Sequence, residues 1–452
     1  MKKSILSLAV ALLVAPAMAQ PVSGPAGPSF DVAAAKQRID ALLDKNYPQL
    51  DALYKDIHAH PEVAFQETRT AGVLAGEMRK LGFEVTEQVG KTGVVAIYKN
   101  GPGPTVLVRT ELDGLPMEEK TGLPYASRAQ QTFEGKQTFV AHSCGHDSHM
   151  AWWVGTAQAL LAMKDQWHGT LMFVGQPAEE TVSGAKAMLD DGLFKRFPKP
   201  DYGFAAHVSA MPQGTVVVKA GVGTSASDAV SIVFKGRGAH GSMPNLSIDP
   251  IVMGAHFVTD VQTLISREKD PQEFGVVTVG AFQSGTVDNI IPDHAELKLT
   301  LRSYSPEVRK LLLDGVKRKA NATAAMANAP APQVTYLHGT GAVRNDDALT
   351  ARASALVKTA FGDKATLVPA TKPGATASED YSEFVDAGVP SVFFGIGGAD
   401  PAAIAKAKAE GKSVPGNHSP YFAPVPEPAI RTGVETLTLA VLMVAGNDAA
   451  KK

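Results

Sequence analysis

The chain has 452 residues, of which 44% are hydrophobic and 19% are charged, and its formal net charge is −2. This length and composition are sufficient for two domains, each with a hydrophobic core. The near-neutral charge, together with the lack of a basic stretch interleaved with aromatic residues, argues against a nucleic-acid-binding protein.

The N-terminal residues have the pattern of a secretory signal sequence. Lys2 and Lys3 precede an apolar run from Ile5 to Val14, and the small residues of Ala17-Met18-Ala19 suit a cleavage site. We therefore predict a signal peptide at residues 1–19 and a periplasmic or secreted protein, whose formal charge becomes −4 when the two lysines are removed. No later uncharged stretch of about 18 to 20 residues predicts a membrane span.

Helical and strand patterns alternate through the first half of the chain. Residues 31–81 have helical periodicity with a break at His60-Pro61, because proline disfavours a helical conformation in the residue before it. Strands are then expected, between helices, at 94–98, 106–109, 170–175 and 203–207. This alternation predicts an α/β domain with a mostly parallel central sheet flanked by helices.

A cluster of potential metal ligands lies between two of these strands. Residues 142–149 contain three histidines, one aspartate and Cys144, the only cysteine of the chain. Thiolate, imidazole and carboxylate groups hold transition metals, although a lone cysteine is more often a small buried hydrophobic residue. A helix is predicted at 151–163 with 145–148 as its entry turn, and a thiol at a helix N-terminus has a lowered pKa. The cluster therefore indicates a metal site that includes the Cys144 thiolate.

Other polar residues follow the ends of predicted strands, where active sites of α/β sheets collect. They are Asp113, the pair Glu179 and Glu180, His207 and His418. Adjacent carboxylates are usually a solvated pair, but this pair follows a continuous apolar strand and a proline. If the pair shares the metal site, one glutamate would bind the ion and the other would accept a proton from water, as a hydrolytic metal centre requires.

From residue 228 the expected order of elements changes to strand, helix, strand, strand, helix, strand, which is typical of the ferredoxin-like βαββαβ module. The expected ranges are 230–234, 249–266, 276–282, 295–301, 306–325 and 333–337. We predict a catalytic domain in two parts, 20–223 and 340–452, and an inserted domain at 224–339.

Two residues of the predicted insert have both a structural and a functional interpretation. Arg302 lies on the polar face of its strand, where a solvated charge is the usual case, but it could bind a substrate carboxylate. His240 lies in a glycine-rich loop, where it could be a turn residue or could donate a hydrogen bond to a developing oxyanion.

Seven motifs, in this order, resemble those of the aminoacylase and carboxypeptidase-G family of metallopeptidases. They are His60-Pro61-Glu62 with Glu67, Leu112-Asp113-Gly114-Leu115-Pro116, Cys144-Gly145-His146-Asp147, Gln176-Pro177-Ala178-Glu179-Glu180, His240-Gly241, Asn289-Ile290-Ile291-Pro292-Asp293 and Ser378-Glu379-Asp380. The resemblance runs from about residue 51 to residue 445. It is greatest to the amidohydrolase branch that includes hippurate hydrolase and the indole-acetyl-amino-acid hydrolases.

The resemblance implies a site for two divalent metal ions, with zinc expected and manganese, cobalt or nickel as alternatives. The implied metal ligands are Cys144, His146, Glu180, His207 and His418. It also implies that Glu179 is the general base, that Asp113 orients the ligands, and that Asn289 and Arg302 contact the substrate. The inserted domain would form a homodimer and a lid, and its His240 would reach the active site of the partner subunit.

Two departures from the pattern of this branch concern residues beside the implied ligands. Glu111 replaces the first aspartate of Arg-Ala-Asp-Met-Asp-Ala-Leu-Pro, and Ser143 replaces the alanine of His-Ala-Cys. Neither change removes an implied ligand, but both alter the groups that surround the ligands and thereby influence metal preference.

The expected function is that of an exported, metal-dependent amidohydrolase that cleaves N-acyl amino acids or small peptides through an activated water. The alternatives are a dipeptidase or carboxypeptidase with the same metal centre, a non-catalytic periplasmic metal- or peptide-binding protein, and a cysteine hydrolase with Cys144 as nucleophile. Trp152 and Trp153 could line a pocket for an aromatic acyl group, although aromatic residues of a helix are more often part of the core.

Overall fold

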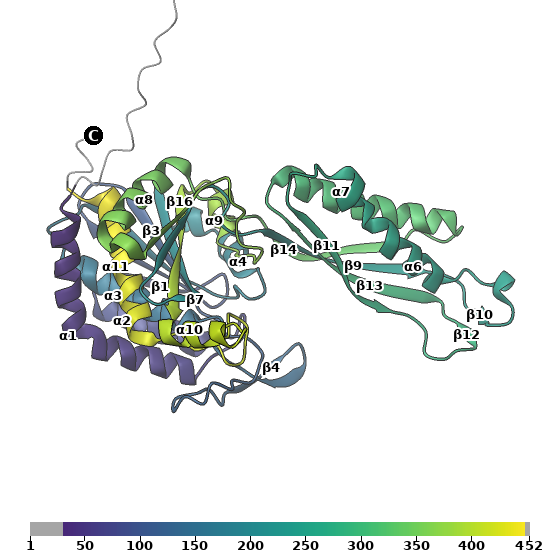
Figure 1. Ribbon diagram of the computed structural model, residues 1–452, viewed down its shortest axis with the longest axis horizontal. Helices are drawn as coiled ribbons and strands as arrows, with labels where there is room; N and C mark the ends of the chain where they lie inside the picture. Colours follow the sequence, from purple (N-terminus) through teal and green to yellow (C-terminus); the bar gives the residue numbers. More distant parts are fainter. Residues whose placement is uncertain (1–29, 448–452) are drawn as a thin grey trace, which may run out of the picture.

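The computed structural model describes residues 30–447 and shows two bodies, one on each side of a narrow junction (Figure 1). The predicted signal peptide at residues 1–19 lies outside the described residues. The larger body is built on an eight-stranded sheet, and the smaller body on a four-stranded sheet that projects from one side of the larger body.

The eight-stranded sheet has the order β1-β2-β6-β3-β7-β16-β8-β15. Its strands are β1 (Glu84–Val89), β2 (Gly93–Asn100), β3 (Thr105–Glu111), β6 (Gly169–Gln176), β7 (Tyr202–Pro212), β8 (Val216–Lys219), β15 (Ala365–Val368) and β16 (Ser391–Ala399). The central strands β6, β3, β7 and β16 are parallel to one another, whereas β2 and β8 flank this centre and pair antiparallel with β6 and β16. The predicted fold class is therefore confirmed, with a sheet that is parallel where it is most buried.

Helices cover both faces of this sheet. One face carries α1 (Val32–Ala59), α2 (Thr68–Lys80), α3 (His146–Ala162), α8 (Asp347–Phe361) and α11 (Pro426–Ala445); the other carries α4 (Gly184–Asp190), α5 (Leu193–Arg196) and α9 (Ser382–Asp386). In β3, Val106 and Val108 join the core of the first face and Leu107 joins that of the second. A strand buried on both faces needs such a continuous apolar run. The break predicted at His60-Pro61 is confirmed, because α1 ends at Ala59.

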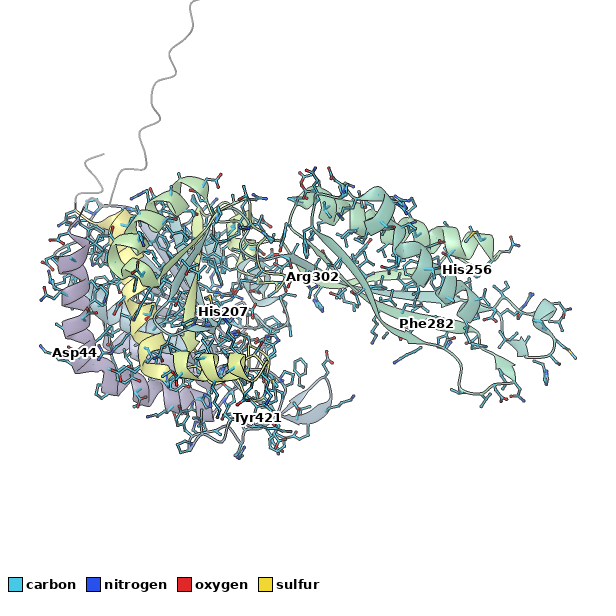
Figure 2. The ribbon with its side chains drawn as sticks, viewed as in Figure 1. Asp44, His207, His256, Phe282, Arg302 and Tyr421 are labelled. Atoms are coloured by element: carbon cyan, nitrogen blue, oxygen red, sulfur yellow. The ribbon has the colours of Figure 1, made fainter. Side chains whose placement is uncertain are left out.

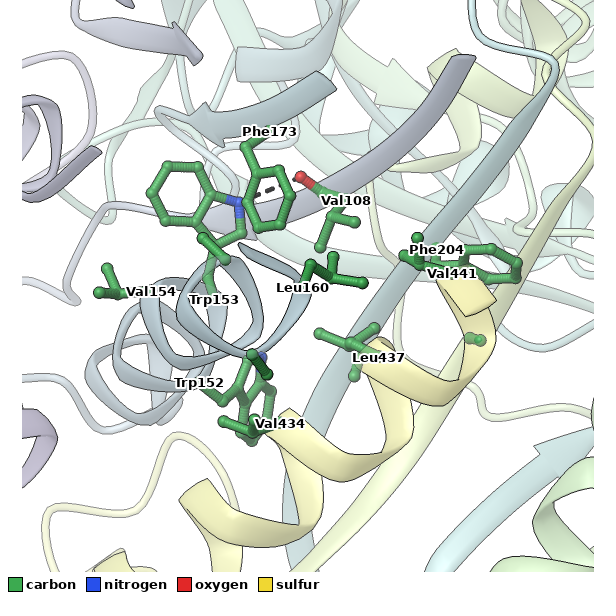
Figure 3. Close-up of a cluster of buried hydrophobic side chains, with 14 of the residues drawn as sticks. Val108, Trp152, Trp153, Val154, Leu160, Phe173, Phe204, Val434, Leu437 and Val441 are labelled. Atoms are coloured by element: carbon green, nitrogen blue, oxygen red, sulfur yellow. Dashed lines mark hydrogen bonds between the residues drawn. The ribbon is translucent and has the colours of Figure 1, made fainter. Parts of the chain in front are cut away.

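Helices α3 and α11 pack closely in the core, as Figure 3 shows. A Cβ atom at Gly433 would come within 2.4 Å of the Trp152 ring, and one at Gly155 would come within 2.5 Å of Val434. Trp153 donates a hydrogen bond from its indole Nε1 to the carbonyl of Val108 at 3.0 Å. Both tryptophans are fully buried, so the interpretation as core residues is right and the one as a substrate pocket is wrong.

The start predicted for the metal-cluster helix is wrong by five residues. The helix α3 begins at His146, and Gly145 precedes it with a φ of +92° that favours glycine. Almost every side chain of α3 is buried, and its first turn, residues 146–149, is polar throughout, so no alternation of polar and apolar positions marks its helical period. The shift places His146 and His149 on the same helix, one turn apart.

The helix α11 is apolar and long enough to cross a membrane, the one such helix among residues 30–447. However, 89% of its apolar window is buried within the protein, where it packs against α1, α3 and α8. A core helix packed between the sheet and other helices explains this composition.

The four-stranded sheet has the antiparallel order β11-β13-β9-β14 and carries two helices on one face. Its elements are β9 (Ala226–Lys235), α6 (Pro250–Val261), the π-turn η2 (Leu264–Glu268), β11 (Gly275–Gln283), β13 (His294–Ser303), α7 (Pro306–Met326) and β14 (Gln333–Thr340). Alternate strand residues such as Val230, Ile232 and Phe234 form its core. This is the predicted ferredoxin-like order, and the helix expected at 249–266 is divided between α6 and η2.

Several short elements were not predicted. A hairpin, β4 (Gln130–Phe133) with β5 (Lys136–Phe139), extends from the larger body, and a ribbon of β10 (Ala239–His240) and β12 (Ile290–Ile291) forms the outer end of the smaller body (Figure 1). The remaining elements are η1 (Pro244–Leu246), η3 (Gly362–Lys364) and α10 (Pro401–Ala409), and α10 has no buried residue.

A buried ion-pair triad joins α1 to the N-terminal turn of α3. The His58 ring lies 2.6 Å from Asp147 through Nδ1 and 3.1 Å from Glu119 through Nε2, and all three residues are buried. Burial alone would lower the pKa of His58, but the hydrogen bonds to the two carboxylates outweigh burial and raise it to about 10. The triad therefore holds a protonated imidazole at neutral pH.

We expect the folded protein to lose stability as the pH rises from about 7 to about 10. The folded pKa of His58 exceeds its unfolded value of about 6.5, so its contribution is complete below 6.5 and decreases by up to about 1.4 kcal/mol per pH unit until about pH 10. His58→Phe should remove this slope and cost about 3 to 5 kcal/mol, because two carboxylates lose their buried partner. Denaturant unfolding at several pH values measures both effects. His60→Phe, a change at an exposed residue, is the control, and an unchanged slope in His58→Phe would contradict the assignment.

Candidate metal centre

The residues predicted at strand ends meet at one edge of the eight-stranded sheet. Asp113 follows β3, Glu179 and Glu180 follow β6, and His207 lies in β7 near the middle of the larger body (Figure 2). His146 comes from the first turn of α3, and His418 from the loop between α10 and α11. Parallel strands bring their carboxyl ends to the same edge, which explains why residues so distant in sequence lie together.

The five predicted metal ligands form one connected cluster. The donor atoms of Cys144, His146 and Glu180 all lie within 4.8 Å of one another. The His207 Nε2 atom lies 3.4 Å from the Cys144 sulfur, and the His418 Nε2 atom lies 3.3 Å from Glu180 Oε2.

Two donor atoms in this cluster are buried without a hydrogen-bond partner among residues 30–447. They are His146 Nε2 and Glu180 Oε1, which lie 3.9 Å apart. A buried polar atom without a partner costs free energy unless a ligand satisfies it. These residues therefore fit a metal ion by their chemistry and by their unsatisfied atoms.

In His146 and His207, the ring nitrogen that faces away from the cluster donates a hydrogen bond to a backbone carbonyl. His146 Nδ1 donates to the carbonyl of Asp113 at 2.8 Å, and His207 Nδ1 donates to the carbonyl of Val208 at 2.7 Å. Both hydrogen bonds use Nδ1 as the donor and leave the Nε2 atom facing the cluster. In the neutral ring this is the tautomer that a metal-binding histidine needs.

Two buried carboxylates hold the loop that carries the glutamate pair. Asp113 accepts hydrogen bonds from the backbone N–H groups of Glu179 at 3.1 Å and Glu180 at 2.9 Å. Glu67 accepts one at 2.8 Å from the N–H of Ala178, whose φ of +50° is unfavourable for a residue with a side chain. The sequence motif includes Glu67 but does not indicate this role, which depends on the conformation of the loop.

The cluster carries an excess of negative charge. Burial lowers the pKa of His146, but its hydrogen bond with Asp113 and the charges of Glu111 and Glu180 raise it to about 10. Burial, offset in part by His146 and reinforced by Asp113, raises the pKa of Glu180 to about 7. Burial and neighbouring carboxylates, Glu379 first, also raise the pKa of Glu179. Divalent cations would neutralise these charges.

The lowered pKa expected for Cys144 is wrong for the protein without metal. Burial, together with the charges of Glu180 and Glu179, raises the pKa of this thiol. The carboxylates outweigh the helix N-terminus, which lies beyond Gly145. A bound cation is therefore what would favour the thiolate.

A second histidine of α3, which was not among the predicted site residues, supports the ligands. His149 Nδ1 donates to Glu111 Oε2 at 2.8 Å, and its Nε2 accepts a hydrogen bond from the N–H of Val208 at 2.9 Å. The donor atoms of His149, Glu111, His146 and His207 lie within 4.8 Å of one another, yet both ring nitrogens of His149 are already used. We therefore interpret His149 as a positioning residue that fixes the middle of β7 beside His207.

Replacing His149 by phenylalanine is expected to weaken metal binding about 10- to 100-fold, as is usual when a partner of the ligand shell is lost. Both His207 and Glu111 would lose an orienting contact, while the ring stack on Trp152 at 4.5 Å would be preserved. Competition with a chromophoric chelator measures the affinity. His149→Gln, which can restore part of the hydrogen bonding, is the control, and metal affinity equal to that of the wild type in both variants would contradict this role.

Glu111 also contacts Arg109, a fully buried cation. Arg109 contacts Glu111, Glu379 at 2.7 Å and Asp380 at 3.2 Å. Arg109 thus neutralises part of the carboxylate cluster behind the site. The longer side chain at 111 therefore links Arg109 to His149 without replacing a predicted ligand.

The three site residues predicted in the insert, Arg302, His240 and Asn289, lie in two different places. Arg302 lines the same cavity as Cys144, Glu179 and His418, at the end of the insert nearest the larger body (Figure 2). His240 and Asn289 lie at the β10–β12 ribbon, at the opposite end of the insert (Figure 1). Within one chain the structure does not bring them to the cluster, because the four-stranded sheet separates them from it.

The cavity beside the cluster has a volume of about 830 Å³. Its wall includes Glu179, Glu180 and His418 on one side, and apolar residues such as Val217 and Phe393 on another. Such a cavity can hold a small molecule with one polar and one apolar part.

The comparison of the sequence with a protein-family profile and its comparisons with individual proteins agree with one another. Residues 107–442 match the sequence profile described as Peptidase family M20/M25/M40. The chain is 36% identical to the hippurate hydrolase of Campylobacter jejuni over 324 residues, which is 70% of this chain and 80% of that protein. It is 34% identical to the N-acetylcysteine deacetylase of Bacillus subtilis over 294 residues, which is 63% of this chain and 73% of that protein.

Solved structures show the same fold over most of the chain. A protein described as an aminohydrolase from methicillin-resistant Staphylococcus aureus aligns with a TM-score of 0.79 and 28% identity, covering 90% of this chain and 99% of that chain. A protein described as a dinuclear metal-binding M20-family peptidase of Bacillus subtilis aligns with a TM-score of 0.71 and 26% identity, covering 89% and 99%.

Proposed function

Because the chain belongs to peptidase family M20/M25/M40, whose members hydrolyse C–N amide bonds with the help of metal ions, we propose that it is an amidohydrolase of N-acyl amino acids. The observation that carries this proposal is the division of the glutamate pair. The donor atoms of Glu180 group with those of Cys144 and His146, whereas Glu179, which lines the same cavity, groups with Glu379 and Asp380. A protein that only bound metal or peptide would not need the second carboxylate.

The relatives support this substrate class. Their names describe a hippurate hydrolase and an N-acetylcysteine deacetylase, both of which act on an acylated amino acid. Arg302 in the cavity wall suits the α-carboxylate of the amino acid, because a guanidinium group can form two parallel hydrogen bonds with a carboxylate. Asn289 is proposed as a further substrate contact, supplied by the insert.

Two divalent ions, with zinc as the first candidate, would be held by Cys144, His146, Glu180, His207 and His418. When bound, they would polarise the amide carbonyl and make water more acidic. Glu179 would accept a proton from the attacking water and deliver it to the nitrogen of the leaving amine. Asp113 would keep both glutamates in position through their backbone N–H groups. Manganese, cobalt or nickel suits the same donor types, so the metal present after purification identifies the native ion.

We also propose that two chains form a homodimer through the insert, so that His240 of one chain stabilises the oxyanion in its partner. Large apolar side chains are exposed near the outer ribbon: Met243, Leu246, Ile251, Val252, Val287 and Ile290. Such a set of exposed apolar residues is typical of an interface. His240 and Asn289 lie beside them, far from the cluster of their own chain.

Mixing two inactive variants tests this arrangement. In a mixed dimer both defects fall in the same site, because the chain with Glu179→Gln receives its oxyanion donor from the chain with His240→Ala. The other site keeps Glu179 and an intact His240, so a mixed dimer should regain activity at one of its two sites. Sedimentation measures the mass of the assembly. A monomer at micromolar concentration, or a mixture as inactive as its parts, would contradict the proposal.

Export is a separate proposal, based on the signal-like residues 1–19. Fractionation of cells that produce the full chain should find the protein in the periplasm or the medium, shortened by about 19 residues by mass spectrometry. A full-length protein in the cytoplasm would contradict it.

The substrate class is tested with a panel of N-acyl amino acids and unprotected dipeptides. We expect hydrolysis of benzoyl- and acetyl-amino acids and little hydrolysis of dipeptides, whose free α-amino group is charged. Faster hydrolysis of dipeptides than of N-acyl amino acids would favour a dipeptidase or carboxypeptidase. Activity that survives complete removal of metal would favour a cysteine hydrolase, since Cys144 has His207 at 3.4 Å.

A further inference from the structure

Lys219, at the end of β8, is a buried cation without a counter-ion in the part of the chain that the structure describes. Its side chain is only 8% exposed and lines the cavity beside the metal cluster. Among residues 30–447 its Nζ atom makes one hydrogen bond, to the carbonyl of Ala220 at 2.6 Å, and no ion pair with a carboxylate. Two of its three N–H donors therefore remain free.

Such an arrangement is costly. Lys269, which is also buried and has no carboxylate partner among the described residues, donates to two carbonyls and does not line this cavity. Arg109, the other buried cation at this end of the sheet, contacts three carboxylates. Lys219 contacts none, and burial lowers the pKa of its ammonium group accordingly. A buried charge without a partner destabilises a fold, so its position in a cavity wall points to a ligand of opposite charge.

The strand register locates Lys219 relative to the metal cluster. His207 in β7 is paired with Gly395 in β16, which is paired with Val217 in β8. Directly paired residues face the same side of a sheet, and Lys219 follows Val217 by two residues on that side. Two strand spacings of about 4.8 Å and two residues of about 3.3 Å place the backbone of Lys219 about 12 Å from that of His207.

The wall between the two residues is apolar where the strand register places Val217, Gly395 and Phe393, all of which line the cavity. A ligand that reaches from the cluster to Lys219 must therefore have an apolar middle part and an anionic end. Arg302 lines the same cavity and also lacks a carboxylate partner among the described residues, so the cavity offers a second cation for a second anionic group.

We propose that Lys219 binds a second carboxylate of the substrate, in addition to the α-carboxylate assigned to Arg302. The preferred substrates are then N-acyl amino acids that carry a further carboxylate, on the acyl chain or on the amino-acid side chain. This inference rests on the proposed amidohydrolase function and specifies its substrates.

Matched substrates test the charge preference. N-glutaryl-L-phenylalanine and N-pentanoyl-L-phenylalanine have acyl chains of equal length that end in a carboxylate and a methyl group. N-acetyl-L-glutamate and N-acetyl-L-glutamine form the corresponding pair for the side chain. We expect the wild type to favour the carboxylate about 10- to 100-fold in kcat/KM in one pair, mainly through KM, which is the usual effect of a hydrogen bond to a charged group. The pair that shows it identifies the half of the substrate that Lys219 contacts.

Two variants connect this preference to Lys219. Lys219→Met should reduce the ratio within the pair to about one, whereas Lys219→Arg should retain most of it. Thermal unfolding and metal content show whether both variants fold. No preference in the wild type, or an equal preference in Lys219→Met, would overturn the proposal.

Direct binding separates this inference from the proposed function. Glutarate should raise the unfolding temperature of the wild type more than butyrate does, and Lys219→Met should lose this difference. If no amide is hydrolysed but the glutarate shift depends on Lys219, the amidohydrolase proposal fails and the anion site remains. If neutral amides are hydrolysed but glutarate has no effect, only the anion site fails.

Discussion

Replacing Glu179 by glutamine is expected to lower kcat about 10²- to 10⁴-fold, the usual contribution of a general base. The amide keeps the size of the side chain but cannot accept the proton of the attacking water. Burial and the neighbouring carboxylates raise the pKa of Glu179 in the metal-free protein, and bound cations would counteract that shift. Initial rates and metal content of the purified variant, measured side by side, decide the result.

Glu180→Gln is the matched control, because it makes the same chemical change one residue away. Glu180 lies within 4.8 Å of the donor atoms of Cys144 and His146, so this variant should lose bound metal together with activity. Glu179→Gln should lose activity and keep the metal. If both variants lose metal equally, the division of labour between the two glutamates is wrong.

Removal of metal is expected to abolish hydrolysis and to lower the unfolding temperature by about 10 °C. An ion at about 1,000 times its Kd stabilises a fold by about 4 kcal/mol, and each kcal/mol shifts the transition of a domain of 150 to 250 residues by about 2 to 4 °C. Without ions, the carboxylates of the cluster repel one another and the His146 Nε2 atom stays unsatisfied. Calorimetry before and after chelation measures the shift.

Adding the metal back should restore both hydrolysis and the unfolding temperature. Irreversible unfolding would not be reversed in this way. Lys186→Ala, a change in an exposed ion pair on α4, is a suitable control for nonspecific effects of the chelator. An unfolding temperature that does not respond to chelation, in a protein that retains hydrolysis, would exclude the metal centre.

The sequence predicted those elements whose pattern is set by burial. The continuous apolar run at 106–108 marks a strand covered on both faces, and the alternation at 230–234 marks one covered on a single face. The strands β1 and β15 show neither a continuous buried run nor a regular alternation of buried and exposed residues. The start of α3 was misplaced because a helix buried all around has no amphipathic period.

The site was predictable to the extent that topology gathers strand ends. Cys144, Glu180 and His207 could be grouped because a parallel sheet brings their positions to one edge. The hydrogen bonds of His149 could not be predicted from the sequence. Its partners Glu111 and Val208 lie on other elements, and only the packed structure orients the ring. The missing counter-ion of Lys219 is likewise a property of its three-dimensional surroundings.

The narrow junction between the two bodies would be the pivot of any rotation of the insert. The chain leaves and re-enters the larger body side by side, where Gly223 donates a hydrogen bond to the carbonyl of Val343 at 2.8 Å. Arg302 is paired with Ser227, the second residue of β9, so it lies close to the pivot. The ten residues of β9 form a lever of about 33 Å, and a rotation of about 10° would move its far end by about 6 Å and Arg302 by about 1 Å. The insert can therefore swing its outer ribbon over a wide arc while the guanidinium group keeps its place in the cavity wall.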